Sequence, residues 1–312
     1  MNRKSRSIII ISLMMLTMLS ALLSEQKPAC KWLEKPVDDQ TFKTFQDFFT
    51  YDQHWPFKMQ SIEVKESEGV RKEHLSFQCT CGEQVFANLY SSVGADFKKT
   101  PALIILHGGS TQGKNAPYVI NLAEIFARAG WVVLAIDMKY FDERSTDLLT
   151  TFTEKEKHDQ LYNQPSLYLE WVIQTVKDIQ RSYDFLVDQI GIDSNRIGLV
   201  GFSRGATIGA IGGGIEHRLA ANLLLFGGHF DALETGHLPA ACPANYIGRI
   251  SPRPLLMINA TQDTDFIRET SVLPLYSLAK SPKKIVWIEG GHGFLTDEAR
   301  SQMLQWLREN IK

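Results

Sequence analysis

Six short apolar runs in the second two-thirds of the chain constrain its fold more than any other feature. Continuous runs of this length are typical of strands buried on both faces of a parallel sheet. The runs are 102–108, 131–137, 196–202, 220–226, 254–260 and 284–290. Helical patterns at 118–130, 167–190 and 297–311 lie between or after them. This alternation predicts an α/β fold built on a mostly parallel, doubly wound sheet.

Three segments upstream of these runs predict an antiparallel start to the sheet. They are 61–67, 74–80 and 84–92, which are rich in β-prone residues. The letters CGEQ between the last two segments indicate a hairpin turn. No linker-like change in composition divides the chain from there to its C-terminus. We therefore expect one α/β domain over 61–312, preceded by an N-terminal extension over 25–60.

The N-terminus is typical of a targeting segment. Arg3, Lys4 and Arg6 precede an apolar stretch over 7–23, and polar residues begin at Ser24. This layout predicts that residues 1–24 are a secretory signal peptide or, as the alternative, an uncleaved N-terminal membrane anchor. The protein is therefore expected to be exported, periplasmic or secreted, with a membrane tether through 7–23 if the segment is not cleaved.

The four cysteines are Cys30, Cys79, Cys81 and Cys242. Outside the cytoplasm they could form one or two disulfides, but their spacing does not fix the pairing. The closely spaced Cys79 and Cys81 lack the second ligand pair of a zinc site, so a structural role is favoured. Lipidation of Cys30 is disfavoured because Lys27 stands where a lipoprotein signal normally has an aliphatic residue.

The charge of the chain points away from nucleic acid as a partner. The formal net charge is −2, with 22% charged and 44% hydrophobic residues, and no basic cluster stands out. A small-molecule ligand is the better expectation. The oligomeric state is not indicated.

A serine on a turn is the strongest chemical signal. The letters GFSRG at 201–205 place Ser203 between a predicted strand and a predicted helix. Such a turn is so sharp that the flanking positions, Gly201 and Gly205, favour glycine. It exposes the hydroxyl at the end of the sheet and leaves the amide of Arg204 near a helix N-terminus, where it can stabilise a negative oxygen.

A serine nucleophile needs a base and a group that orients the base. Asp263 follows the run 254–260, and His292 follows the run 284–290 in a glycine-rich turn. Ser203, Asp263 and His292 each lie just beyond the end of a predicted parallel strand. We therefore expect these three candidate catalytic residues to meet at one edge of the sheet.

The acid and the base each have rival residues. Asp265 is the rival acid, but it lies further from the strand end. The rival histidines, His107, His229 and His237, do not follow the strand that carries the acid.

The letters LHGGS at 106–110 are the candidate second half of an oxyanion hole. Consecutive glycines allow backbone amides to approach a ligand closely, so the amide of Gly109 or of Ser110 is the expected donor beside Arg204. The alternative is a glycine-rich turn that binds nothing. A phosphate loop is disfavoured, because no Walker pattern precedes Lys114.

Two long interruptions, 139–166 and 228–252, follow the ends of predicted parallel strands. Ligands of open α/β sheets bind at that edge. We interpret both as substrate-facing segments, with solvated surface loops as the alternative.

The motifs LHGGS, GFSRGA, NATQDTD and GGHGF, in that order, resemble the α/β-hydrolase superfamily. The segment 243–263 is similar to dienelactone-hydrolase-like and acetyl-xylan-esterase-like carboxylesterases. The resemblance implies a serine esterase with Ser203, Asp263 and His292 as its triad, needing no cofactor and no metal, and acting on a small-molecule ester.

Arg204 departs from this family pattern, since many esterases have an apolar residue there. It is either a surface or salt-bridged arginine or a charge that favours acidic substrates. Two other functions stay open. One is a serine peptidase of the prolyl-oligopeptidase type, although residues 25–60 leave no room for the large additional N-terminal domain of those enzymes. The other is a non-catalytic binding protein on a hydrolase scaffold.

Overall fold

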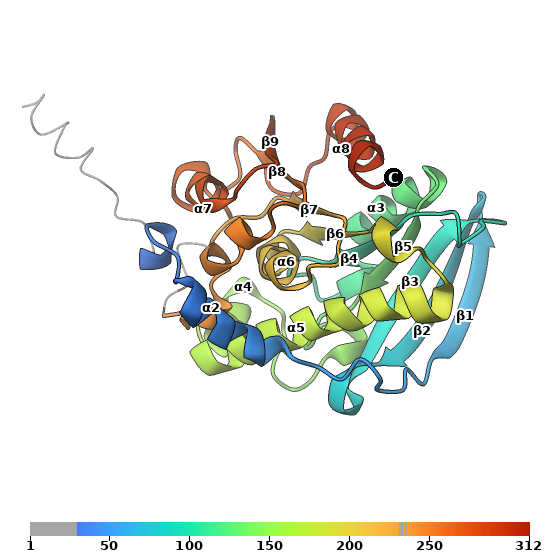
Figure 1. Ribbon diagram of the computed structural model, residues 1–312, viewed down its shortest axis with the longest axis horizontal. Coiled ribbons are helices and arrows are strands. Elements are labelled where there is room, and N and C mark those ends of the chain that lie inside the picture. The colour runs from blue at the N-terminus through green and yellow to red at the C-terminus, as the bar shows by residue number, and fades with distance from the viewer. Residues whose placement is uncertain (1–29, 231–233, 235) are drawn as a thin grey trace, which may run out of the picture.

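The computed structural model describes residues 30–230, 234 and 236–312. The predicted signal peptide or anchor, including the tether 7–23, lies outside the described residues. Within them, no helix is long and apolar enough to cross a bilayer. Figure 1 shows a central twisted sheet with helices on both of its faces.

The nine strands of the sheet follow the order β1-β2-β3-β5-β4-β6-β7-β8-β9. Their bounds are β1 Gln60–Ser67, β2 Val70–Gln78, β3 Gln84–Ser92, β4 Ala102–Leu106, β5 Val132–Ile136, β6 Ile197–Phe202, β7 Ala221–Leu225, β8 Leu255–Ala260 and β9 Lys283–Ile288. The pairs β1–β2, β2–β3 and β3–β5 are antiparallel, and every later pair is parallel. The predicted parallel sheet with an antiparallel start is confirmed.

Helices close both faces of the sheet. Their bounds are α2 Asp39–Gln46, α3 Pro117–Arg128, α4 Glu154–Lys157, α5 Pro165–Phe185, α6 Arg204–Ile215, α7 Leu273–Leu278 and α8 Asp297–Asn310. Residues of α3 and α8 pack in one apolar core, and residues of α5, α6 and α7 belong to the cores of the other face. Strand β4 is continuously apolar because both of its faces are buried. Leu103 and Ile105 enter the core that contains α3 and α8, whereas Ile104 and Leu106 enter a core on the other face.

The boundaries differ from the sequence prediction in small ways. The helix expected over 167–190 is α5 followed by a π-helical turn, Leu186–Ile190, which ends where Gly191 adopts a φ of 85°. Strand β2 begins at Val70, earlier than the predicted 74, because it pairs along most of β1 and all of β3.

The turn from β6 to α6 depends on a close backbone approach. A Cβ atom on Gly205 would overlap the carbonyl oxygens of His107 and Leu106, at the end of the neighbouring strand β4. These are backbone atoms of a buried strand and cannot move aside at low cost. Glycine at this position therefore keeps α6 against the sheet.

We predict that Gly205→Ala lowers the free energy of unfolding by about 3 kcal/mol, because the added methyl group meets rigid backbone. Denaturant unfolding measures this value. The matched control is Gly291→Ala, since a Cβ there meets no atom within 4 Å. Equal stability of the two variants would contradict the close-approach argument.

Candidate active site

Ser203 occupies a strained turn between β6 and α6. Its φ is 54° and its ψ is −119°, a region that non-glycine residues seldom adopt. The Ser203 amide donates to the carbonyl of Leu225 at 2.8 Å, which fixes the turn to strand β7. Gly201 is also required, because a Cβ there would overlap the backbone of Gly205 and Ala206. The side chain of Ser203 consequently stands at the edge of the sheet.

The structure brings His292 and Asp263 to Ser203. His292 Nε2 lies 2.8 Å from Ser203 Oγ, and His292 Nδ1 lies 2.8 Å from Asp263 Oδ2. Since a carboxylate only accepts, Nδ1 carries the hydrogen, and Nε2 of the neutral ring accepts from the serine hydroxyl. The three residues form one continuous hydrogen-bonded chain.

Asp263 is held more firmly than its rival Asp265. Asp263 is buried, and its Oδ1 accepts the amides of Asp265 and Phe266 at 2.9 and 3.0 Å. The Asp265 side chain is 61% exposed and lies 3.8 Å from His292 Nε2, the nitrogen that faces the serine. Only Asp263 is therefore placed to orient the imidazole through Nδ1.

The three rival histidines have other surroundings. His107 hydrogen-bonds to the backbone of Gly108 and of Met138, and His229 lies beside Cys242. His237 stacks on Phe230, with ring centroids 3.8 Å apart. Each of these contacts is with a group other than Ser203.

Two side chains from other segments of the chain help to fix the LHGGS turn. The Gly108 amide donates to the Tyr118 hydroxyl at 2.8 Å, and Lys157 Nζ donates to the Gly109 carbonyl at 2.8 Å. Gly109 and Ser110 line the same cavity as Ser203 and Arg204. These contacts hold the turn in one conformation beside Ser203.

The cavity in front of Ser203 has a volume of about 580 Å³, within the usual size range of small-molecule sites. Phe202 and Phe266 contribute apolar surface. Lys157, His158 and Tyr162 contribute polar groups from the interruption 139–166. The position of this segment after a parallel strand predicts that it faces the substrate. The individual residues could not be predicted, because a polar loop has no hydrophobic periodicity that shows which side chains point inward.

Arg204 is a salt-bridged arginine. It is only 6% exposed, its Nη1 lies 2.5 Å from Glu234 Oε1, and its guanidinium lies 4.2 Å from the ring centre of Tyr162. The positive charge is neutralised by Glu234, which belongs to the interruption 228–252. This arrangement agrees with the salt-bridge interpretation and gives no support to selection of acidic substrates.

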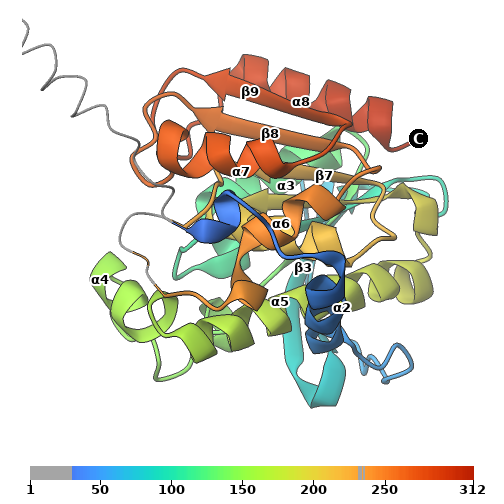
Figure 2. The same ribbon diagram turned by 60° about the vertical axis from the view of Figure 1, so that its left-hand side comes forward.

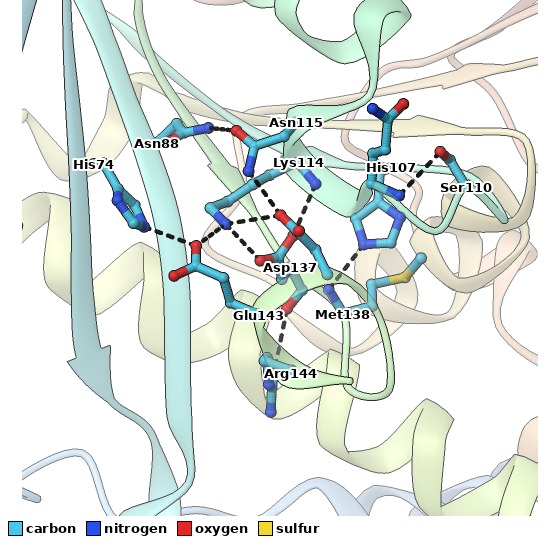
Figure 3. Close-up of polar contacts among 12 residues, drawn as sticks. His74, Asn88, His107, Ser110, Lys114, Asn115, Asp137, Met138, Glu143 and Arg144 are labelled. Atoms are coloured by element: carbon cyan, nitrogen blue, oxygen red, sulfur yellow. Dashed lines mark hydrogen bonds and ion pairs between the residues drawn. The ribbon is translucent and has the colours of Figure 1, made fainter. Parts of the chain in front are cut away.

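A buried ionic cluster lies behind the LHGGS turn (Figure 3). Lys114 Nζ lies 2.6 Å from Asp137 Oδ2 and 3.1 Å from Asp142 Oδ2, and it also contacts Glu143. Lys114 and Asp137 are fully buried. The cluster joins the connection after β4 to the connection after β5. The Lys114 ammonium is therefore paired with carboxylates of the protein, which agrees with a structural role rather than phosphate binding.

Two groups of side chains among the described residues have metal-ligand spacing. The carboxylates of Asp137, Asp142 and Glu143 form the first group, but the Lys114 ammonium already lies among them. The second group is Cys30, His229 and Cys242, which belongs to a different part of the molecule. Neither group includes Ser203 or His292.

His107 fixes the backbone of the LHGGS turn. Its Nε2 accepts the Met138 amide at 3.0 Å (Figure 3). Its Nδ1 therefore carries the hydrogen and donates to the Gly108 carbonyl at 2.6 Å. Burial lowers the pKa of His107 to about 4. The ring is therefore neutral in the folded protein at ordinary pH.

We predict a stability change between about pH 6.5 and pH 4 that depends on His107. In this window an unfolded histidine binds a proton that the folded state does not bind. The stabilisation is complete above about pH 6.5 and is lost as the pH falls toward 4, by about 3 kcal/mol. Denaturant unfolding of the protein and of His107→Gln across this window measures the difference. An equal slope for both would contradict the assignment.

The described fold and the residues around Ser203 define an α/β hydrolase. The chain matches the model of the dienelactone hydrolase family over residues 87–307, and it belongs to that family. It is accordingly an enzyme of a hydrolase family that acts on esters. The comparison with curated proteins gives no match.

Solved structures of low sequence identity share the fold. An acetyl xylan esterase from Paenibacillus sp. R4 has a TM-score of 0.68 at 16% identity, covering 91% of this chain and 100% of its own. Acetyl xylan esterase 1 from Thermoanaerobacterium sp. JW/SL YS485 has 0.68 at 17%, with coverages of 92% and 100%. A cold-adapted esterase from an Arctic intertidal metagenomic library has 0.61 at 16%, with coverages of 81% and 100%.

Proposed function

We propose that the protein hydrolyses carboxylic esters through a covalent acyl-enzyme on Ser203. The observation that carries the proposal is the hydrogen-bonded chain from Ser203 through His292 to Asp263 at the wall of the cavity. This arrangement has the nucleophile, base and orienting acid that acyl transfer by serine requires. Family membership supports the substrate class.

In the proposed first step, Ser203 Oγ attacks the ester carbonyl while His292 Nε2 takes the hydroxyl proton. Asp263 keeps Nδ1 protonated and stabilises the imidazolium. The tetrahedral intermediate collapses when the imidazolium gives its proton to the leaving alcohol, and the acyl group stays on Ser203. Water then attacks the acyl-enzyme with His292 again as base, which releases the acid.

The negative oxygen of the intermediate needs donors that are already in place. We propose the backbone amide of Arg204, in the first turn of α6, and the amide of Gly109 or Ser110. Two observations support this role: Arg204 lines the cavity directly after Ser203 at the start of α6, and its guanidinium is engaged by Glu234. Lys157 and Tyr118 support it by fixing the opposite turn.

We also propose that the chain is exported under the direction of residues 1–24. The positive head, the apolar stretch 7–23 and Ser24 support this placement. Cell fractionation with N-terminal sequencing tests it. A mature N-terminus after Ser24 would indicate a cleaved signal, a retained segment in the membrane fraction would indicate an anchor, and intact chain in the cytoplasm would contradict export.

We predict that Ser203→Ala reduces kcat/KM for nitrophenyl esters by about 10⁴-fold or more, because the nucleophile is lost. Thermal unfolding should stay close to that of the parent protein. The matched control is Ser301→Ala, an exposed serine of α8, which should retain full turnover. A panel from acetyl to decanoyl esters would also report the acyl-chain preference. Undiminished turnover by pure Ser203→Ala would refute the assignment.

Asp263 and Asp265 provide a matched test of the acid. Asp263→Asn should reduce kcat by about 10⁴-fold, because an amide favours the wrong tautomer of His292. Asp265→Asn, two residues away and exposed, should change kcat by less than about threefold, since an exposed charge interacts weakly. Steady-state kinetics on one nitrophenyl ester compares them, and the reverse order of effects would assign the role to Asp265.

A further inference from the structure

The first described residues form a strap across the segment that follows β7. We define the strap as residues 30–49, which include α2, and its partner as the 239–250 segment. The Val37 amide donates to Asn245 Oδ1 at 3.0 Å, and Arg249 Nη1 lies 2.8 Å from Asp39 Oδ1. Figure 2 shows the strap lying in front of α6 and beside the chain of the 239–250 segment.

Apolar contacts hold the same two segments together. Tyr246 is fully buried, and the rings of Phe42 and Phe49 pack against it edge-on, at centroid distances of 5.5 and 5.9 Å. Arg249 covers Phe42, with its guanidinium carbon 3.8 Å from the ring centre. The strap therefore has a fixed position on the folded protein, and Cys30 at its start has a defined neighbour.

That neighbour is Cys242. The two sulfur atoms lie 3.9 Å apart although the residues are 212 positions apart in the chain. Cys242 is fully buried, whereas Cys30 is partly exposed. The buried side chain of His229 brings Nε2 to 3.3 Å from Cys242 Sγ. Three reactive groups from distant parts of the sequence thus meet at one point.

Two kinds of chemistry suit such a group: metal binding and disulfide formation. A structural zinc ion takes four protein ligands, and among the described residues this group offers three. A ligating histidine normally donates its other ring N–H to an acceptor. His229 Nδ1 is buried and has no hydrogen-bond partner in the described part of the chain. A disulfide needs only the two sulfur atoms, so the surroundings favour it.

We propose that Cys30 and Cys242 form a disulfide bond that fastens the strap to the 239–250 segment. The bond would tie the strap to the same β7–β8 connection that supplies Glu234, the ionic partner of Arg204 beside Ser203. The pairing could not be read from the spacing of the cysteines, and only the folded chain brings these two together.

The reaction is a thiol–disulfide exchange with a disulfide-containing oxidant, such as oxidised glutathione. The Cys30 thiolate attacks one sulfur of the oxidant and displaces the first thiolate, which leaves a mixed disulfide on Cys30. Cys242 then gives its proton to His229, and its thiolate attacks Cys30 Sγ. The second thiol of the oxidant leaves with that proton, so two electrons pass from the protein to the oxidant.

The surroundings assign these two roles. The hydrogen bond with Cys242, together with a smaller effect of His229, lowers the pKa of the partly exposed Cys30 to about 4. Burial raises the pKa of Cys242 above its usual range. The accessible sulfur is therefore the thiolate that meets the oxidant, and the buried sulfur completes the bond.

Peptide mapping tests the bond directly. The folded full chain is equilibrated with oxidised glutathione, alkylated, digested without reductant and analysed by mass spectrometry. We expect a linked peptide containing Cys30 and Cys242, lighter by two hydrogen atoms than the two separate peptides, while Cys79 is alkylated after denaturation. Alkylation of both Cys30 and Cys242 would overturn the proposal. A stoichiometric zinc ion that protects both thiols would also overturn it, in favour of a metal site.

Thermal unfolding gives a second measurement that does not depend on esterase activity. The oxidised protein should lose roughly 5 °C or more in Tm when a reductant is added, because the bond constrains a long loop of the unfolded chain. Cys30→Ser should have the lower Tm and no response to reductant. The matched control Cys79→Ala should keep both the linked peptide and the response. A full reductant response in Cys30→Ser would contradict the pairing.

Discussion

The structure depends on the close packing of two neighbouring strand ends. Strands β4 and β6 lie side by side in parallel, and Gly205 at the start of α6 contacts the backbone at the end of β4. Next to this contact Ser203 has a positive φ of 54° and lies beside Gly108. The positions of Ser203 and of the LHGGS turn are therefore linked through the packing of these two strand ends.

Strand order explains how the other two residues arrive. Because β8 and β9 are parallel to β6 and lie on the same side of it, the turns after them open at the same edge of the sheet. Asp263 and His292 occupy those turns. Buried ion pairs lie near the site: Lys114 pairs with Asp137, and Arg204 pairs with Glu234. Removing one partner of such a pair leaves a costly buried charge.

Much of this arrangement could be predicted from the sequence. Continuous apolar runs predict the buried strands. Residues that follow such runs in a parallel sheet lie at the same edge, so the sequence alone predicts that Ser203, Asp263 and His292 lie close together. The exact strand order and the roles of Lys157, Tyr162 and Glu234 could not be predicted. These side chains lie in polar connections without periodicity, and their partners are remote in the chain. The approach of Cys30 to Cys242 could not be predicted either, because these two residues are also remote in the chain.

Covalent labelling with a fluorophosphonate would show whether Ser203 is an activated nucleophile, because such a probe reacts with a serine only when a base and an oxyanion site activate it. We expect one adduct per chain, located on the peptide that contains Ser203, and none in a folded His292→Ala variant. An adduct on another residue, or no adduct on well-folded protein, would refute the proposed role of Ser203.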